Sequence, residues 1–389
     1  MNSGRTVFSP LIGFLPDREF RRCVSRYDGD HRLREFSCWD PYLTMAFAQL
    51  TYRESLRDIE ACLRSLHGKL YHRGFQSRVA RSTLADANES RDWRIYADFA
   101  QVLLGIARPL YAHDPIGVDL EHSLYALDST TIDLCLLLFP WARFRQHKAA
   151  VKMHTLLDLR GSIPTFLRIT EGTMHDGNIL DEILPAAGAC SVMDRGYLDF
   201  QRLFRFTLCS ACFVVRTKEN VLLQRRYARP VDQTSGLRSD HTVILTALQS
   251  AAAYPDPLRR VTYFAVETKK RWQFLTNNFV LPGLTIAQIH TCRWQVERFF
   301  QWIKQHLRSK AFCGTSENAV KTPIWVAVSI YVLVAIVRKR LGLEASLYQI
   351  PQILSVTLFE KVPILQALEA SDFQDNLVAD RNQLMLSDF

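Results

Sequence analysis

Three acidic residues, far apart along the chain, stand in surroundings that suit metal-ion chemistry. Asp128 lies within or at the end of the apolar strand "LYALDSTT", Asp194 ends a strand in "SVMDRGY", and Glu297 lies in the aromatic helix "RWQVERFFQWIKQHL". Carboxylate oxygens are hard ligands that hold Mg²⁺ or Mn²⁺ rather than zinc. Two such ions activate a water or a 3′-hydroxyl and stabilise the leaving oxygen of an in-line phosphoryl displacement.

Two basic residues accompany the glutamate. On a helical wheel of about 100° per residue, Arg293, Glu297 and Lys304 fall within roughly 40° of one another, on the rim of the buried face. Arginine suits bidentate phosphate contact and lysine a point-charge contact. We therefore expect Glu297 to ligate metal, and Arg293 and Lys304 to contact DNA phosphates.

Each of these residues also has an ordinary structural explanation. Arg293 and Glu297 form an i, i+4 pair, Asp128 beside Ser129 suits a cap, and Asp194 before Arg-Gly suits a turn. What favours a site is the expected sheet order, in which the strands of Asp128 and Asp194 are neighbours and the helix of Glu297 packs across them. The three carboxylates would then converge.

The elements that must position these residues have the order of a mixed α/β sheet. The runs "SLYALDSTTIDLCLLL", "AVKMHTLLDL" and "SIPTFLRIT" read as strands, the last two joined by a hairpin turn at residues 160–162. A short helical segment, "ILDEILPAA", precedes the strand "CSVM", the helix "DFQRLFRFTL" and the strand "CFVVRT". Three strands, helix, strand, helix, strand is the order of a ribonuclease-H-like core.

The segments that flank the core have other hydrophobic patterns. Residues 42–66 and 82–106 are helical, the second run beginning at the N-cap Ser82, and their arginines suit either DNA or a solvated bundle. Strand patterns recur at 242–248, 260–268 and 272–280. We predict a helical N-terminal DNA-binding domain at 1–118 and a ribonuclease-H-like core in two parts, 119–216 and 284–340. A β-rich insertion at 217–283 separates the two parts, and an acidic helical tail with a possible dimerisation role follows at 341–389.

Charge and cysteine usage narrow the setting. The net charge is +9, but residues 341–389 carry −5, which leaves +14 on the first 340 residues. A basic surface suits a polyanionic partner, since each phosphate contact releases counterions.

Nine scattered cysteines and no secretory signal predict a reduced, cytoplasmic compartment, and Cys209 and Cys212 lack the second pair of a zinc site. The apolar run 323–337 is shorter than the roughly 20 residues of a membrane span and predicts a buried helix, so no membrane partner is expected.

These residues carry a resemblance. The run His290, Arg293, Glu297, Lys304 resembles the tyrosine-(2)-arginine-(3)-glutamate-(6)-lysine signature of DDE transposases of the insertion sequence 4 family, with every spacing kept. "LDSTTIDL" is similar to the family's first-aspartate region and "MDRGYLDF" to its second. The resemblance spans roughly residues 120–340, and "RSTLADAN" near residue 81 is similar to the N-terminal part of related bacterial enzymes.

The resemblance implies a catalytic and metal-binding triad of Asp128, Asp194 and Glu297 with two Mg²⁺ ions, for which Mn²⁺ can substitute. It implies cut-and-paste transposition: nicking at the element's ends, hairpin formation on the flanking strand, and strand transfer. The partners would be double-stranded DNA at element ends and in the target, with a homodimer on DNA in the nucleoid. The signature's tyrosine is His290 here, so its phosphate contact would be lost, weakened or made by imidazole.

Further candidates have equally good structural explanations. Trp272 stands where related enzymes use an aromatic to hold a flipped base, but it also suits a buried strand. His175 would approach the metals or simply lie in a loop. Lys148, Lys152 and Arg195 would contact backbone phosphate or remain solvated.

Three functions therefore compete. The first is a metal-dependent transposase. The second is a decayed or domesticated copy that binds DNA without cutting it, motivated by His290 and the basic body. The third is a ribonuclease-H-like nuclease that cuts without joining, against which the long β-rich insertion argues.

Overall fold

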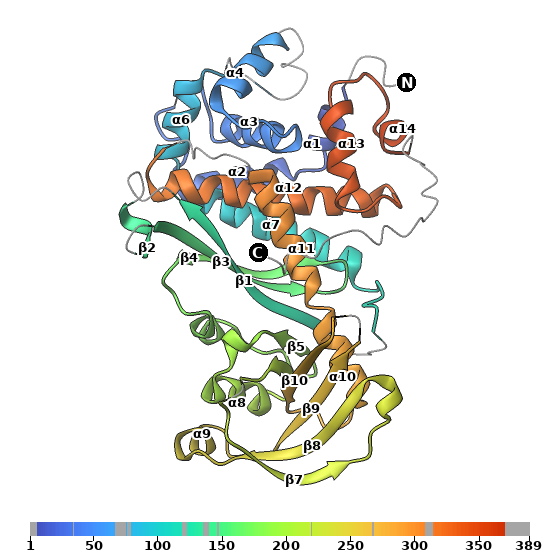
Figure 1. The fold of residues 1–389 in the computed structure, drawn as a ribbon. Helices are drawn as coiled ribbons and strands as arrows, with labels where there is room; N and C mark the ends of the chain where they lie inside the picture. The colour runs from blue at the N-terminus through green and yellow to red at the C-terminus, as the bar shows by residue number, and fades with distance from the viewer. Residues whose placement is uncertain are drawn as a thin grey trace.

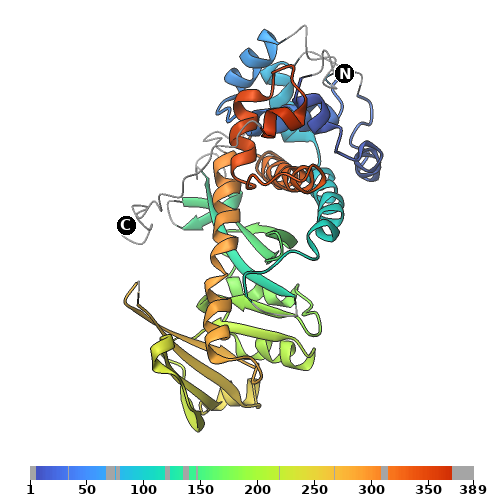
Figure 2. The same ribbon diagram turned by 90° about the vertical axis from the view of Figure 1, so that its right-hand side faces the viewer.

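The computed structural model has its N-terminal and C-terminal helices gathered at one end and a long mixed sheet running through the rest of the molecule (Figure 1). One helix, α11 (Trp294–Leu307), connects the two parts and lies along the sheet (Figure 2). The structure describes residues 6–33, 35–66, 75, 79–118, 123–134, 140–145, 148–218, 220–266, 268–307 and 314–369.

The core of the sheet joins antiparallel and parallel strands. Its strands are β1 (Leu124–Leu134), β2 (Arg143–Arg145), β3 (Lys148–Asp158), β4 (Ile163–Glu171), β5 (Cys190–Met193) and β6 (Cys212–Arg216). β3 pairs antiparallel with β1, β2 and β4, whereas β5 runs parallel to both β1 and β6. The ribonuclease-H-like order is therefore confirmed, including the predicted adjacency of β1 and β5.

Local predictions in the core hold with one change. The turn at 160–162 does join β3 to β4, and "DFQRLFRFTL" forms α8 (Phe200–Leu208). The short helical segment predicted at 179–187 is the 3₁₀ helix η3 (Asp176–Asp181), which starts earlier and overlaps the prediction only at 179–181. His175 caps it by accepting a bond from the Gly177 N–H, which holds the turn at its start.

The β-rich insertion continues the core sheet. Its strands are β7 (Leu223–Arg229), β8 (Leu237–Leu245), β9 (Leu258–Ala265) and β10 (Lys270–Thr276), with α9 (Leu248–Ala253) between β8 and β9. β10 pairs antiparallel with β6, so the sheet order is β2-β3-β1-β5-β6-β10-β9-β8-β7. The sequence did not predict β7 because this exposed edge strand, "LQRRYAR", lacks apolar alternation.

The N-terminal region is helical, as predicted, but its helices are shorter. They are α1 (Phe8–Ile12), α2 (Asp17–Arg26), α3 (Trp39–Leu50), α4 (Leu56–Ser65), α6 (Arg81–Ser90) and α7 (Trp93–Tyr111). The run 82–106 is two helices, because Asp92 caps α7 by accepting a bond from the Arg94 N–H. The predicted cap Ser82 lies inside α6, whose N-cap position is Ala80.

The helices α10 (Gly283–Thr291) and α11 are also separate, although the wheel placed Arg293 and Glu297 on one helix. Backbone bonds shorten to i, i+3 across the junction, from the Arg293 N–H to the His290 carbonyl and from the Val296 N–H to the Arg293 carbonyl. Arg293 therefore lies in a tight turn just before α11.

A buried helix, α12 (Glu317–Arg340), passes through the helical region. By length and composition this helix could cross a membrane, so the prediction that the apolar segment is too short to do so was wrong. However, 94% of its most apolar 18-residue stretch is buried inside the protein, as expected for a core helix. It packs on α3, α6, α7 and α11. Two further helices, α13 (Gln349–Thr357) and α14 (Ile364–Glu369), confirm the helical character of the tail as far as residue 369.

The turn between β3 and β4 packs closely against helix α7. Gly161 has φ +71°, and a Cβ there would lie 1.9 Å from the ring of Tyr111, whose hydroxyl donates to the Ala335 carbonyl on α12. Gly117 has φ +83° but no described atom within 4 Å of such a Cβ. We expect Gly161→Ala to lower the free energy of unfolding by about 1–3 kcal/mol more than Gly117→Ala, measured by urea denaturation. Equal losses would show that the Tyr111 contact is unimportant.

Candidate active site

Two of the predicted acidic residues lie side by side because of the strand register. The parallel pairing of β1 and β5 sets Leu127 opposite Met193, so the next residues, Asp128 and Asp194, are also opposite. Arg216 continues the row on β6, since Met193 pairs with Val215. Asp128, Asp194 and Arg216 thus stand at one level across three neighbouring strands.

Glu297 is linked to Asp128 by ion pairs that both carboxylates form with Arg293. The Arg293 guanidinium binds Asp128 through one terminal nitrogen and Glu297 through the other, the latter at 2.6 Å. Glu297 lies in the first turn of α11, where the helix dipole favours a carboxylate. The side chains of Asp128 and Arg293 are each 18% exposed, whereas that of Glu297 is 56% exposed. The site is therefore open to solvent on the Glu297 side.

Asp194 has its own cation. Its Oδ1 lies 2.9 Å from Nε of Arg216, whose guanidinium lies 5.1 Å from the centre of the Trp272 ring. Sequence reasoning missed Arg216. The signal was present, because "CFVVRT" was predicted as the strand after Asp194, and a parallel register places its terminal arginine beside that aspartate.

The surroundings of the carboxylates shift the pKa of Asp128 upward. Burial raises the pKa of Asp128 to about 6, with further upward pushes from the negative charges of Glu297 and Asp194. Arg293 and the Ser129 N–H, which donates to Asp128, act in the opposite direction. Arg293 and the Ser129 N–H thus offset the effect of burial only in part, and a bound cation would stabilise the ionised form of Asp128 further.

The three carboxylates suit a divalent metal by donor type and by the convergence of their elements. As the side chains stand, arginines hold them, and across the described parts of the chain no three His, Cys, Asp or Glu side chains enclose an ion position. Two carboxylates nevertheless meet at one positive group, the guanidinium of Arg293. The donor set therefore fits Mg²⁺ or Mn²⁺ at a place now taken by a cation of the protein itself.

His290 is buried beside this site. Its ring centre lies 4.6 Å from that of Phe274 and 6.0 Å from that of Trp272, and its Nε2 has no hydrogen-bond partner among the described residues. Burial lowers the pKa of His290 to about 3, with Arg293 adding to the effect. The imidazole is thus neutral at pH 7, and its predicted phosphate contact would rest on a single N–H group.

The remaining lysine candidates differ in setting. Lys304 is exposed on α11, two helical turns beyond Glu297. Lys152 is nearly buried and binds Asp176 at 3.1 Å and the Met174 carbonyl at 2.8 Å. Asp176 also accepts a 2.7 Å bond from Ser129, next to Asp128, so Lys152 belongs to a polar cluster that supports the row. The side chain of Lys148 lies outside the described residues.

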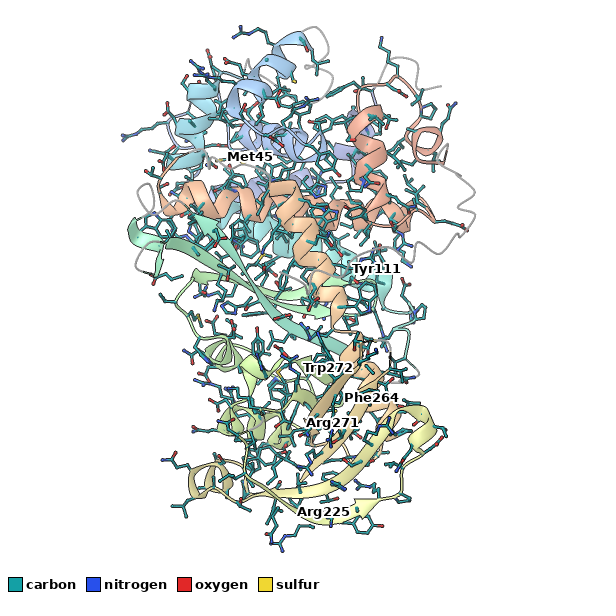
Figure 3. The ribbon with its side chains drawn as sticks, in the orientation of Figure 1. Met45, Tyr111, Arg225, Phe264, Arg271 and Trp272 are labelled. Carbon is teal, nitrogen blue, oxygen red and sulfur yellow. The ribbon has the colours of Figure 1, made fainter. Side chains whose placement is uncertain are left out.

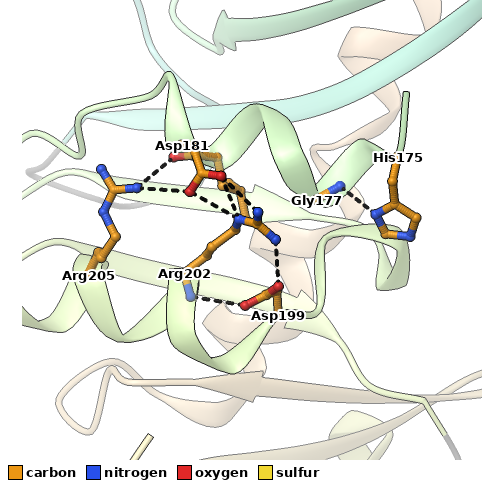
Figure 4. A network of polar contacts seen from close by, with 7 residues as sticks. His175, Gly177, Asp181, Asp199, Arg202 and Arg205 are labelled. Carbon is orange, nitrogen blue, oxygen red and sulfur yellow. Dashed lines mark hydrogen bonds and ion pairs between the residues drawn. The ribbon is translucent and has the colours of Figure 1, made fainter. Parts of the chain in front are cut away.

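The other candidates lie around the rim. His175 is exposed and caps η3, which an Arg202–Asp181 pair at 2.8 Å ties to α8 (Figure 4). Arg195 is exposed directly after Asp194. Trp272 is half-buried on β10 between Arg216 and His290. The roles predicted for these three residues remain predictions.

The buried histidine makes a pH-dependent contribution to stability. Because the pKa of His290 is about 3 in the folded chain and about 6.5 in an unfolded one, only the unfolded chain gains this proton as pH falls below about 6.5. Stability should be lost with falling pH by up to about 1.4 kcal/mol per unit. We expect His290→Phe to reduce the loss in unfolding free energy between pH 7 and pH 5, measured by urea denaturation.

The control is His31→Gln, which removes an exposed histidine. If His290→Phe and wild type lose the same free energy between the two pH values, the burial described for His290 is wrong.

Comparison with known families gives two matches. The model described as "Transposase DDE domain" matches residues 119–333, which include all three carboxylates. The model described as "Domain of unknown function (DUF4372)" matches residues 3–76. The first match covers more than half of the chain.

Three relatives share this region. The protein y4zB of Sinorhizobium fredii, named as a transposase, is 30% identical over 282 residues, covering 72% of this chain and 77% of that protein. The transposase ascribed to insertion sequence element IS5377 of Geobacillus stearothermophilus is 34% identical over 212 residues, 54% and 55% of the two chains. The one ascribed to element IS4SA of Synechocystis is 25% identical over 331 residues, 83% and 87%.

Among solved structures, the piggyBac transposase synaptic complex with hairpin DNA aligns with a TM-score of 0.45 and 11% identity, over 94% of this chain and 82% of that one. The family match and the 30% identical relative agree with the resemblance of the sequence motifs. This chain belongs to the family of transposases with a DDE domain.

Proposed function

We propose that this chain is the transposase of a bacterial insertion sequence and that it cuts and joins DNA by metal-dependent phosphoryl transfer. The observation that carries the proposal is the row of Asp128 and Asp194 on paired strands, with Glu297 brought to it by the shared contact with Arg293. The family membership supports it, and the names of two relatives associate those proteins with insertion sequences.

Asp128, Asp194 and Glu297 would hold two Mg²⁺ ions, or Mn²⁺ in their place. Such ions activate the attacking oxygen and stabilise the leaving oxygen of an in-line displacement. In the first reaction a water oxygen attacks the phosphorus and the P–O3′ bond breaks, which leaves a 5′-phosphate and a free 3′-hydroxyl. That hydroxyl is the nucleophile for hairpin formation, and a 3′-hydroxyl at the element end is the nucleophile for strand transfer into target DNA.

The protein's own residues would position the DNA. Lys304 is exposed on the same helix as Glu297, so both project from α11 toward a duplex lying over the row. Arg293 would contact a phosphate through the nitrogens that now bind Asp128 and Glu297. His290 contributes at most a neutral N–H donor, because burial keeps its pKa low. A homodimer on DNA remains part of the proposal.

Cleavage of end-containing DNA tests the reaction. The chain is incubated with Mg²⁺ and a duplex carrying the inverted repeat that flanks its gene, and products are resolved on denaturing gels. Asp128→Asn, Asp194→Asn and Glu297→Gln should each reduce the cleavage rate by about 1,000-fold or more, the size expected when a group acting on the transition-state charge is lost. Asp133→Asn is the matched control, since Asp133 is exposed on the same strand as Asp128 and should be dispensable.

Unchanged cleavage in all three variants would overturn the proposed site. Cleavage without strand transfer into a supercoiled plasmid would indicate a nuclease, and a band shift with neither reaction would indicate a DNA-binding protein that no longer cuts.

The position of Arg293 predicts competition with metal. Because its guanidinium occupies the place where Asp128 and Glu297 meet, Arg293→Gln should strengthen Mg²⁺ binding in the DNA-free protein. The rise in Tm on adding Mg²⁺ should be larger in this variant than in wild type. Arg298→Gln is the control, because Arg298 is exposed on α11 and stacks on Trp294 instead. Equal rises in Tm for both variants would refute the competition.

A further inference from the structure

A row of arginines crosses the insertion sheet. Arg225 lies on β7, Arg260 on β9 and Arg271 on β10, with His241 of β8 directly opposite Arg260. Figure 3 labels Arg225 and Arg271, which lie in this part of the molecule. We call Arg225, His241, Arg260 and Arg271 the arginine row.

The strand register gives the row a diagonal course. Arg225 pairs with Val243, which pairs with Leu258, two residues before Arg260. Arg271 pairs with Phe264, four residues after Arg260. With about 4.8 Å between strands and about 3.3 Å per residue, the row is about 25 Å long. Duplex DNA carries one negative charge per about 1.7 Å of axis, so a row of this length faces many phosphates.

The row lies on the face of the sheet away from α10. Trp272 faces α10, where its ring approaches His290, and neighbouring residues of a strand point to opposite faces. Arg271 therefore points away from α10. Near α8 and α9 this same face is apolar, with Val243 and Leu258 in the core cluster, and it becomes basic where those helices no longer cover it.

The arginines of the row have no acidic partners. Among the residues the structure describes, no carboxylate lies within ion-pair distance of Arg225, Arg260 or Arg271. Arg260 is half-buried, its Nε is buried without a hydrogen-bond partner in that described set, and one terminal nitrogen faces the His241 ring at 3.2 Å. By contrast, Arg259 on the opposite face binds Asp240 at 2.6 Å and two backbone carbonyls.

Such an arrangement costs stability in the protein alone. Burial lowers the pKa of Arg260, and the neighbouring charges of Arg271 and Arg225 lower it further. Burial and the same kind of repulsion, from Arg260 and Arg225, lower the pKa of His241. A polyanion that supplied oxygen acceptors would remove both penalties.

We propose that the arginine row is a DNA-binding surface that holds the sugar-phosphate backbone of a duplex segment outside the cleavage site. The row has the length and the unpaired donors for several phosphates. Backbone contacts of this kind bind DNA without reading its sequence.

The test rests on the proposed function, since it assumes a DNA substrate, and it separates the two. Binding of a 30-bp duplex of unrelated sequence is measured by fluorescence anisotropy in EDTA, across 50–200 mM salt. Arg225→Gln/Arg271→Gln should reduce the slope of log K against log salt by about 1.8, since each phosphate contact contributes about 0.9. The control, Arg168→Gln/Arg205→Gln, removes two arginines of the core that are already paired with Glu182 and Asp181, and should leave the slope unchanged.

A single variant separates binding from folding. Arg260→Gln should weaken DNA binding about 3- to 10-fold at 100 mM salt, in line with one lost phosphate contact. Its Tm should be unchanged or higher, because the variant removes the central unpaired charge of the row. A merely structural arginine would give a lower Tm instead.

The outcomes distinguish the two ideas. If wild type binds no duplex even at 50 mM salt, both the DNA function and the row are wrong. If wild type binds and cuts DNA but the double variant keeps its slope, or the control loses as much, the row is refuted and the proposed function stands.

Discussion

The structure depends on the neutralisation of three carboxylates brought together at one level of a sheet. Parallel pairing of β1 with β5 sets Asp128 beside Asp194, and α11 adds Glu297. Like charges this close destabilise one another unless cations intervene. Arg293 and Arg216 supply that charge, one between Asp128 and Glu297 and the other against Asp194. The DNA-free protein therefore satisfies its site internally, and bound metal and DNA would exchange partners with existing cations.

The insertion has a defined part in this arrangement. The insertion leaves the core after β6 and returns through β10. β10 pairs with β6, the strand that carries Arg216 beside Asp194. The chain then turns directly into α10 and, after a tight turn at Arg293, into α11. Because β10 is hydrogen-bonded to the core, the start of α10 is set by the sheet. The position of Glu297 thus follows from the register of the insertion as well as from packing in the core.

Much of this arrangement could be predicted from the sequence. The order of apolar runs gave adjacent strands for Asp128 and Asp194, since a strand that follows a crossover pairs beside an earlier one. The turn at Gly161 was predictable because few residues besides glycine adopt its backbone conformation readily.

Other features depend on tertiary contacts that periodicity does not encode. The break between α10 and α11 was missed because apolar residues continue through both helices, whereas the i, i+3 bonds that end α10 leave no mark in residue type. β7 was missed because an exposed edge strand has no buried face to pattern. Arg216 became visible only through strand register. The roles of the predicted site residues stay predictions.

The central place of α12 has a consequence for biosynthesis. Its buried surface receives α3, α6 and α7, which are made first, and α11, which is made much later. A chain emerging from the ribosome therefore presents the apolar faces of its early helices without their partner until residue 340 has been translated. Packing of α3, α6 and α7 on α12 must wait until α12 has been made, and chains terminated before it would expose those faces to chaperones and proteases.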